Sequence, residues 1–193
     1  SLNRKGFDEA IGREIARALT TGEIETVIDD FAAAAARAER AGFDGVQLHG
    51  AHGYLLCQFL DARQNTREDG YGGDYAGRTR IIHEVLDAVR ARTGDGFQVG
   101  IRLSPERFGV DLAEMVQLAS DVLARGDLDY VDLSLWDVTK LPAGAKEGPL
   151  LIDHFLGLPR HGTALGVAGH LMSAADAQTV LTKGADLAFI GKG

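Results

Sequence analysis

The stretch AGFDGVQL, residues 41–48, ends one helical pattern and begins a strand, and the same design returns twice in the chain. RGDLDYVDL (125–133) and KGADLAFI (183–190) likewise pass from a glycine through an aspartate into an apolar run. Strands that read as continuous apolar runs are covered on both faces, which is typical of parallel strands joined by helical crossovers. The sequence therefore predicts repeated βα units and an α/β fold.

Helix and strand signals divide the chain into alternating elements. Helix starts are marked by three capping pairs: Thr20 with Glu23, Asp111 with Glu114, and Ser173 with Asp176. The predicted helices are residues 22–41, 53–60, 78–93, 111–125, 149–158 and 173–183. The predicted strands are residues 43–50, 97–104, 128–135, 164–169 and 186–191, and a polar loop covers 61–77.

Two architectures contain such units, a doubly wound open sheet and a (β/α)₈ TIM barrel. Polar or glycine-rich residues follow every predicted strand, as in HGAHG (49–53), RLSPERFG (102–109) and VAGH (167–170). A barrel collects all of its βα loops on one face, whereas an open sheet concentrates its site at one switch point. The pattern favours a barrel, but five strands in 193 residues are too few to close one of typical size.

Composition limits the class of protein and of partner. A chain of 193 residues with 45% hydrophobic residues is expected to form one domain, residues 1–193. The net charge of −8 and the lack of a basic run argue against nucleic acid as a partner. No apolar stretch approaches the length of a membrane span. With Cys57 as the one cysteine and no leader-like N-terminus, we expect a reducing, cytoplasmic location.

The most reactive cluster follows the first long strand, where HGAHGY places His49, His52 and Tyr54 within six residues. Two imidazole N–H groups could hold a carbonyl oxygen and stabilise negative charge that develops there, and a phenol could deliver a proton. Two other interpretations stay open on the residues alone. Both histidines with Cys57 could be zinc ligands, although no further ligand follows at a recognisable spacing. Alternatively, the histidines and Tyr54 only shape and pack the loop.

The order HGAHGYLLCQFL, then NTRED, then YGG, then an arginine-bearing helix closely resembles the signature of the Old Yellow Enzyme family. The resemblance extends from about Thr20 to Gly191, and FDGVQLHGAHGYLLCQFL and NTREDGYGG are its most specific parts. It implies an FMN-dependent (β/α)₈-barrel enzyme that takes hydride from NAD(P)H and reduces an activated C=C bond of an α,β-unsaturated carbonyl compound. No metal is implied.

The resemblance also implies residue roles. His49 and His52 would bind the substrate carbonyl oxygen, and Tyr54 would protonate the α-carbon. Arg102 would lie against the flavin pyrimidine edge, where a positive charge stabilises the reduced flavin. From the residue alone, Arg102 could equally close a structural ion pair at the rim of the barrel. The flavin phosphate would be bound by two loops: Ala168, Gly169 and His170 in one, and Gly191 and Lys192 in the other.

Other residues are expected to be structural. Asn65, Arg67, Asp69 and Tyr71 would pair the backbone of the polar loop, and Cys57 would pack as a small apolar residue. Trp136 could cover the site or simply pack. DYAGR departs from the family pattern before Arg78, which suggests looser packing of that arginine.

The largest departure is that three barrel strands of the family pattern do not precede residue 22, and that the final barrel helix does not follow. The chain therefore reads as the C-terminal five-strand portion of a barrel, with two exposed sheet edges through which it would self-associate. Three alternatives remain open: a non-catalytic half-barrel without flavin, a dienoyl-CoA reductase or amine dehydrogenase-type relative, and another barrel enzyme with a phosphorylated substrate.

Overall fold

A five-stranded parallel sheet forms the centre of the computed structural model, which describes residues 7–8, 13–14 and 17–191. The strands are β3 (Gly45–Gly50), β4 (Gln98–Leu103), β5 (Tyr130–Ser134), β6 (Ala164–Ala168) and β7 (Leu187–Phe189). All five predicted strands are confirmed, each a little shorter than expected. Near the N-terminus, β1 (Phe7–Asp8) and β2 (Arg13–Glu14) pair as a separate antiparallel ladder.

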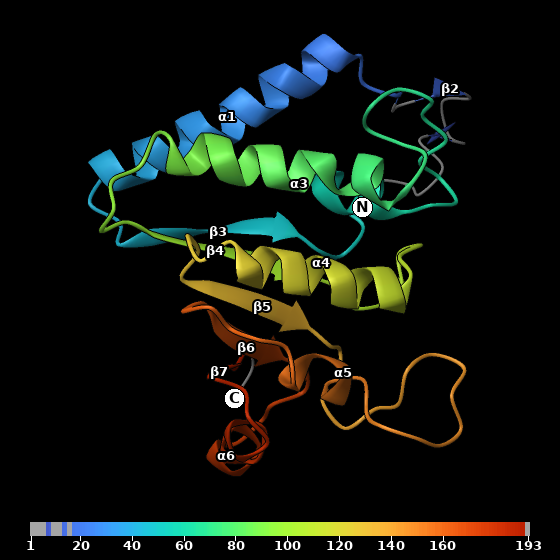
Figure 1. The fold of residues 1–193 in the computed structure, drawn as a ribbon, viewed down its shortest axis with the longest axis vertical. Helices are drawn as coiled ribbons and strands as arrows, with labels where there is room; N and C mark the ends of the chain where they lie inside the picture. The colour runs from blue at the N-terminus through green and yellow to red at the C-terminus, as the bar shows by residue number, and fades with distance from the viewer. Residues whose placement is uncertain (1–6, 9–12, 15–16, 192–193) are drawn as a thin grey trace.

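Helices connect successive strands of the sheet (Figure 1). They are α1 (Thr21–Arg40), α2 (Leu55–Leu60), α3 (Tyr75–Arg90), α4 (Leu112–Ala124), α5 (Asp153–Leu156) and α6 (Ala174–Thr182). The predicted helices are all present, but the one expected over residues 149–158 is reduced to the four residues of α5. A long loop precedes α5, and backbone bonds such as Leu151 N–H to Lys140 O (2.9 Å) close it.

The order of the strands distinguishes the two predicted architectures. The sheet runs β3-β4-β5-β6-β7, in chain order and without a reversal. Parallel crossovers are right-handed, so a sheet that always grows in one direction receives all its crossover helices on one face. A doubly wound sheet would show a switch point. The structure is therefore a barrel-type sheet, left open within the described residues at its β3 and β7 edges, as predicted.

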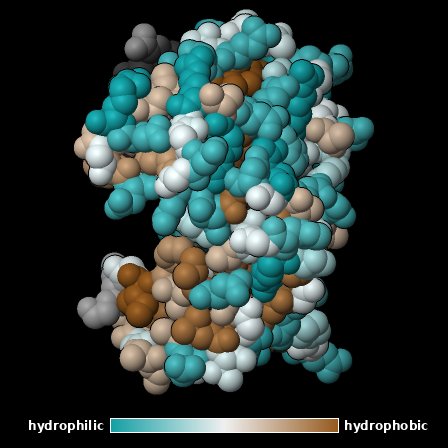
Figure 2. Space-filling view, turned by 60° about the vertical axis from the view of Figure 1, so that its left-hand side comes forward, coloured by the Kyte–Doolittle hydropathy of each residue, from teal (hydrophilic) through white to brown (hydrophobic). Residues whose placement is uncertain are grey.

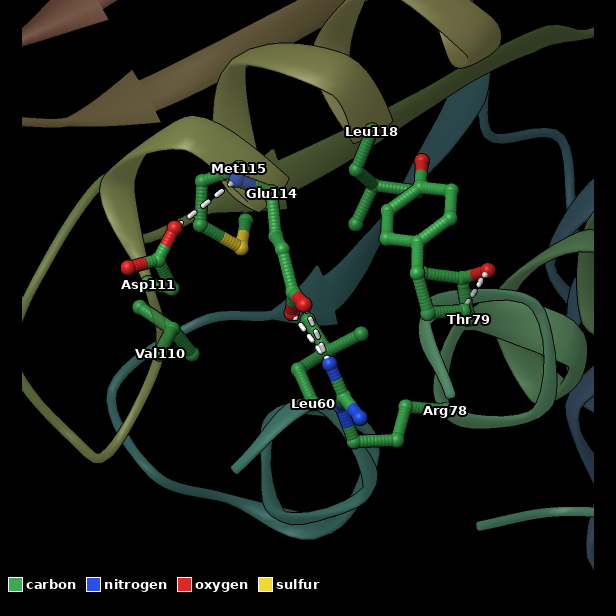
Figure 3. Close-up of a pocket in the computed structure, with 9 residues that line it drawn as sticks. Leu60, Arg78, Thr79, Val110, Asp111, Glu114, Met115 and Leu118 are labelled. Atoms are coloured by element: carbon green, nitrogen blue, oxygen red, sulfur yellow. Dashed lines mark hydrogen bonds and ion pairs between the residues drawn. The ribbon is translucent and has the colours of Figure 1, made fainter. Parts of the chain in front are cut away.

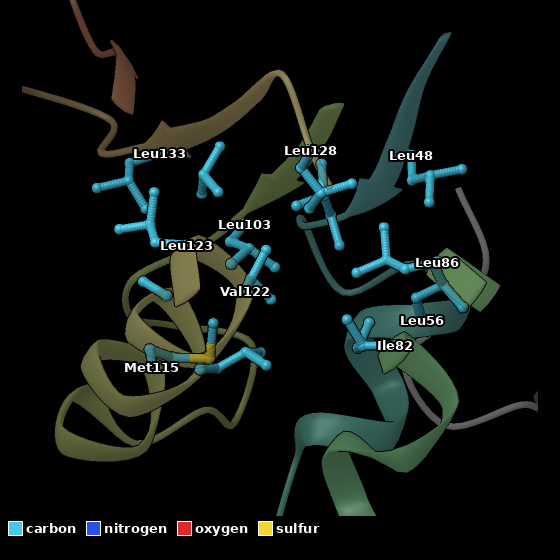
Figure 4. Close-up of a cluster of buried hydrophobic side chains, with 14 of the residues drawn as sticks. Leu48, Leu56, Ile82, Leu86, Leu103, Met115, Val122, Leu123, Leu128 and Leu133 are labelled. Atoms are coloured by element: carbon cyan, nitrogen blue, oxygen red, sulfur yellow. The ribbon is translucent and has the colours of Figure 1, made fainter. Parts of the chain in front are cut away.

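Alternate residues of each strand face the helices and form the core. Val99, Ile101 and Leu103 of β4 are fully buried, and so is Val131 of β5. Figure 4 shows helix side chains such as Ile82 and Val122 in one hydrophobic cluster with strand residues such as Leu103. Burial of each large aliphatic side chain contributes about 1.5–3 kcal/mol. The opposite face of the sheet, which carries the other residues, is therefore available for a site.

Helix starts agree with all three predicted capping signals, since Ser173 also caps α6, and the start of a fourth helix corrects the prediction. Thr20 and Glu23 form the expected capping box of α1, and Asp111 caps α4. Helix α3, in contrast, begins at Tyr75 and not at Arg78. The side chain of Asp74 accepts a hydrogen bond from the Gly77 N–H (2.9 Å) and so caps the helix three residues earlier than predicted.

The polar loop before α3 is held by side-chain to backbone bonds, as expected. The Asn65 amide donates to the carbonyl oxygens of Phe59 and Tyr71, both at 2.8 Å. Arg67 donates to Leu19 O (2.7 Å), and the Tyr71 hydroxyl donates to Glu84 (2.7 Å). Burial and this bond to Glu84 raise the pKa of Tyr71 to about 12, so the phenol stays protonated. The structural interpretation of the loop is confirmed.

A small pocket lies between α3 and α4, and Arg78 is one of the residues that line it (Figure 3). The Arg78 side chain is 8% exposed and binds the Glu114 carboxylate and the Gly73 carbonyl oxygen. The prediction that DYAGR loosens this arginine is therefore wrong, because Glu114 of the next helix supplies the partner. The cavity measures about 10 Å³, which is room for at most one water molecule.

Gly77 offers a test of how tightly this loop packs. A Cβ at Gly77 would lie 2.0 Å from the backbone carbonyl oxygen of Gly72, whereas a Cβ at Gly22, in the first turn of α1, would meet nothing within 4 Å. Helix propensity alone favours alanine at both positions by about 1 kcal/mol. We expect Gly22→Ala to be neutral or stabilising and Gly77→Ala to destabilise by about 1–3 kcal/mol in urea unfolding. Equal stabilisation by both changes would contradict this packing.

Candidate active site

Three polar side chains lie in one row across the open face of the sheet. His49 of β3 pairs in register with Arg102 of β4, Arg102 with Asp132 of β5, and Asp132 with Gly166 of β6. Because side chains alternate along a strand, these residues point away from the helix-covered core. The row lies near the carboxyl ends of the strands, where the active sites of barrel enzymes lie.

Aromatic rings also lie on this face of the sheet. A Cβ at Gly100 would lie 2.3 Å from the Tyr130 ring, and one at Gly166 would lie 2.3 Å from the Phe189 ring. The rings of Tyr130 and Phe189 are 5.8 Å apart. The two glycines thus make room for two aromatic rings on the same face as the polar row.

The predicted catalytic residues come together at the end of β3. The ring centroids of His49 and His52 are 5.0 Å apart, and those of His49 and Tyr54 are 5.2 Å apart. Tyr54 is 52% exposed and precedes α2 as its N-cap, so the residue is accessible to a ligand. Two N–H-bearing rings and a phenol therefore converge on one region of the rim.

Two serines that the sequence analysis missed fix the orientation of His52. The His52 backbone N–H donates to Ser104 Oγ (3.0 Å), and His52 Nε2 lies 2.7 Å from Ser134 Oγ. Ser104 directly follows β4, the strand next to β3, and Ser134 is the last residue of β5, one strand further along the sheet. The alternation of DLS in β5 places Ser134 on the same face as Asp132, and this period-2 pattern could have identified it.

Both histidines are shifted towards the neutral form. Burial lowers the pKa of His49, and the nearby Arg102 guanidinium lowers it further. Burial also lowers the pKa of His52, with added repulsion from His49 and Arg102. A neutral imidazole keeps one N–H donor and one acceptor nitrogen. If Ser134 donates to Nε2 of His52, the proton of that ring lies on Nδ1, which leaves a donor for a second ligand.

Arg102 takes part in a buried ion pair, one of the two roles considered for it. Its Nε lies 3.3 Å from Asp132 Oδ2, which also accepts a hydrogen bond from the Gln47 amide (3.1 Å). Asp132 is fully buried, while the Arg102 side chain is 27% exposed. Among the described residues, neither Arg102 Nε nor Asp132 Oδ1 has a hydrogen-bond partner. Arg102 is thus held by Asp132, and its partly exposed guanidinium keeps donors for a ligand.

The buried carboxyl group of Asp132 should make stability depend on pH. Burial raises its pKa, against the opposing effects of Arg102 and Gln47. A raised folded-state pKa contributes stability that is fully present below the unfolded pKa of about 3.9 and is lost as the pH rises through the folded pKa. Relative to Asp132→Asn, the wild-type free energy of unfolding should therefore fall as the pH rises above about 4.

Urea unfolding at several pH values measures this difference. Asp30→Asn, at an exposed position of α1, is the matched control and should run parallel to the wild type. Parallel curves for the wild type and Asp132→Asn would contradict a raised pKa at Asp132.

The predicted phosphate loops follow β6 and β7, at the edge of the sheet opposite to β3. The carbonyl oxygens of Ala168 and Gly169 accept hydrogen bonds from Leu135 N–H (2.8 Å) and Val138 N–H (3.2 Å) of the loop after β5. Within the described part of the chain, the N–H groups of Gly169 and His170 donate to no acceptor. Gly191 is exposed after β7, and Lys192 lies outside the described residues. The loop after β6 thus offers two backbone donors to an anion.

The nearby start of α6 is less open than predicted. Ser173 caps the helix, but the Asp176 carboxylate accepts hydrogen bonds from the Met172 N–H (3.0 Å) and the Ser173 hydroxyl (2.8 Å). A carboxylate at a helix N-terminus competes there with any other anion. The loop donors, more than this helix terminus, therefore suit a phosphate.

Left-handed backbone conformations recur in the loops at this rim. Four loops each contain a non-glycine residue with positive φ: His52 (63°) after β3, Arg107 (68°) after β4, Trp136 (68°) after β5 and His170 (52°) after β6. Such conformations cost about 1–3 kcal/mol each and gather at functional sites. These residues therefore hold backbone conformations in the folded protein that they would rarely adopt on their own.

Among residues 17–191, no three His, Cys, Asp or Glu side chains form a group that could hold a metal ion. Cys57, which the zinc interpretation required, is fully buried on α2, and burial raises the pKa of its thiol. A buried thiol with a raised pKa is a poor metal ligand and a poor nucleophile. The described helices also include none that is long and apolar enough to cross a membrane.

Comparison with known proteins identifies the family to which the chain belongs. A sequence model of the NADH:flavin oxidoreductase / NADH oxidase family matches residues 3–192. The chain is 38% identical over 189 residues to the probable NADH-dependent flavin oxidoreductase YqiG of Bacillus subtilis (strain 168), a match that covers 94% of this chain and 50% of that protein. It is 56% identical over 89 residues to 12-oxophytodienoate reductase 1 of Oryza sativa subsp. japonica, over 46% of this chain and 23% of that protein.

Solved structures agree with the sequence relatives. Morphinone reductase in complex with tetrahydroNAD matches with a TM-score of 0.71 and 36% identity, over 90% of this chain and 46% of that chain. This chain thus spans about half the length of that enzyme and of the Bacillus subtilis relative, and its five strands form part of a TIM barrel. The chain belongs to the NADH:flavin oxidoreductase / NADH oxidase family, the Old Yellow Enzyme family of oxidoreductases that use FMN and NAD(P)H.

Proposed function

We propose that this protein is an FMN-dependent oxidoreductase that reduces the activated C=C bond of an α,β-unsaturated carbonyl compound with hydride from NAD(P)H. The observation that carries the proposal is the convergence of His49, His52 and Tyr54 beside Arg102 on the open face of the sheet. The names of two relatives, 12-oxophytodienoate reductase and morphinone reductase, both denote reduction of oxo compounds.

The open face suits the flavin. A planar, polar ring needs a flat wall and hydrogen-bond donors, and here Arg102 presents a partly exposed guanidinium that pairs with Asp132. Arg102 would bind the pyrimidine edge, and the loop at Ala168, Gly169 and His170, together with Gly191 and Lys192, would bind the phosphate. FMN, when bound, supplies the hydride that NAD(P)H delivers to the site.

The histidines would act on the substrate carbonyl. Neutral imidazoles donate one hydrogen bond each, and two donors aimed at one oxygen stabilise the charge that develops as the C=C bond accepts hydride. Ser134 and Ser104 hold His52 in place for this task. Donors that are already oriented need no rearrangement during the reaction, which is the main source of such stabilisation.

Tyr54 would supply the proton. Its ring lies 5.2 Å from that of His49, and the residue is half exposed, so its hydroxyl would reach a substrate held by the two histidines. A phenol retains its proton at neutral pH and gives it up only to a strongly basic carbon. Proton delivery to the α-carbon would complete the reduction.

The specific alternative is a half-barrel that assembles without flavin, because β3 and β7 each leave one side unpaired in the described sheet. Figure 2 shows hydrophobic residues gathered at the end of the molecule that carries β7 and α6, where Met172, Leu181, Leu187 and Ile190 are all at least 38% exposed. We propose that the protein self-associates through these edges. A monodisperse monomer in solution scattering would refute self-association.

Anaerobic incubation of the FMN-loaded protein with NADH or NADPH, followed by 2-cyclohexenone, tests the proposed activity. We expect bleaching of the flavin absorbance by one of the nucleotides and its return when cyclohexenone is added, with cyclohexanone as the product. Bleaching without reoxidation by the enone would reject enone reduction and leave only the transfer from the nucleotide to flavin.

A further inference from the structure

A cationic side chain lies over an indole ring at the rim, outside the roles described above. The guanidinium carbon of Arg107, in the loop after β4, lies 4.6 Å from the centre of the Trp136 ring, in the loop after β5. Both residues have φ near 68°. Trp136 is 69% exposed, so packing does not explain its position. Two strained loops thus present a large aromatic face and a guanidinium together.

Other contacts fix this pair beside the histidines. The Glu106 carboxylate binds the Lys140 ammonium and accepts a hydrogen bond from the Ala143 N–H (2.7 Å), which ties the loop after β5 to the loop after β4. On the other side, the Phe108 ring lies 6.1 Å from that of His52, and a Cβ on Gly53 would lie 3.0 Å from Phe108. The pair therefore has a fixed place next to the proposed carbonyl site.

The charges around the pair leave Arg107 without an anion. Glu106 is neutralised by Lys140, and Asp132 pairs with Arg102. Arg107 forms no ion pair with any residue in the described ranges. An arginine presents a planar set of donors that matches a carboxylate in a bidentate manner, and an indole face stacks on flat conjugated groups.

We propose that Arg107 and Trp136 form a recognition platform for substrates that carry a carboxylate on a flat, conjugated carbonyl skeleton. The indole would stack on the skeleton, and Arg107 would bind the carboxylate while His49 and His52 bind the carbonyl oxygen. This inference rests on the proposed function for the identity of the reacting carbonyl, but binding to the platform does not require flavin.

The fluorescence of Trp136 tests the platform directly, because it is the one tryptophan of the chain. The probes are 4-carboxycinnamaldehyde and cinnamaldehyde, which share the same flat enal and differ by one carboxylate. We expect both to quench Trp136, with the carboxylate compound acting at about tenfold lower concentration, as a charge-assisted bidentate contact supplies. Arg107→Gln should abolish that difference, Arg107→Lys should retain part of it, and Arg40→Gln, at an exposed position of α1, should leave it unchanged.

Equal quenching by the two probes in the wild type, or an unchanged preference in Arg107→Gln, would overturn the platform. Kinetics of the FMN-loaded protein separate this inference from the proposed function. We expect Trp136→Ala to raise KM for 4-carboxycinnamaldehyde more than it lowers kcat. Reduction of both enals with equal KM would reject the platform alone, whereas Arg107-dependent quenching without any enal reduction would support the platform and reject the proposed activity.

Discussion

His49→Ala is expected to lower kcat for 2-cyclohexenone reduction by about 10²–10³-fold, because it removes one of two oriented donors to the substrate oxygen. His49 lies on β3 in register with Arg102, and its ring faces both His52 and Tyr54. The lowered pKa of His49 keeps its ring neutral, so the loss is that of a hydrogen bond and not of a charge. Steady-state kinetics of the FMN-loaded variant measures the effect.

The controls separate catalysis from folding and from flavin binding. His154→Ala, at an exposed position of α5, should leave kcat unchanged. FMN affinity should also stay within about twofold in His49→Ala, since uncharged donors to the substrate contribute little to cofactor binding. A variant that keeps wild-type kcat would show that His49 does not stabilise the transition state, and the proposed mechanism would then be wrong.

Arg78→Ala is expected to lower the free energy of unfolding by about 3 kcal/mol, at the lower end of the range for breaking a buried ion pair. The Arg78 side chain is 8% exposed, but Glu114 keeps 34% of its side chain in water, which moderates the loss. The variant also removes the bond from Arg78 to the Gly73 carbonyl oxygen, which closes the start of α3. Urea unfolding with a fixed m-value measures the change.

Arg92→Ala is the matched control for this variant. Arg92 pairs with Asp29, but its side chain is 45% exposed, and exposed pairs contribute about 0–1 kcal/mol. If both variants lost the same free energy, the Arg78–Glu114 pair would not link α3 to α4 as the structure shows. A change of m-value in Arg78→Ala would instead point to a change in the denatured state.

Local signals in the sequence were sufficient to predict the strands, the helices and the barrel-type order. Capping residues and glycines act within a few positions, so Thr20, Glu23 and Asp111 marked their helices correctly. Asp74 was overlooked because the polar loop and the first turn of α3 have similar composition. Helix α5 is shorter than predicted, because an apolar run alone does not fix where a helix begins. Its N-cap residue, Ile152, makes no side-chain hydrogen bond that caps the helix.

The hydrogen-bond partners of the site residues could not be predicted from such local signals. His49, His52 and Tyr54 are close in sequence, and their motif alone indicated a cluster. The bonds from His52 to Ser134 and from Gln47 to Asp132 cross 82 and 85 positions. Such contacts depend on the register between strands, which local sequence does not specify. The same holds for Arg78 and Glu114, 36 positions apart.

The most direct test of the account is titration of this chain with FMN, followed by quenching of the flavin fluorescence. Saturable binding is expected, and it should weaken at least tenfold in Arg102→Ala, because a charged hydrogen bond to the flavin is lost. Arg40→Ala, far from the open face on α1, should bind as the wild type does. Absence of binding, or equal binding by the wild type and Arg102→Ala, would contradict the claim that this face of the sheet holds the cofactor.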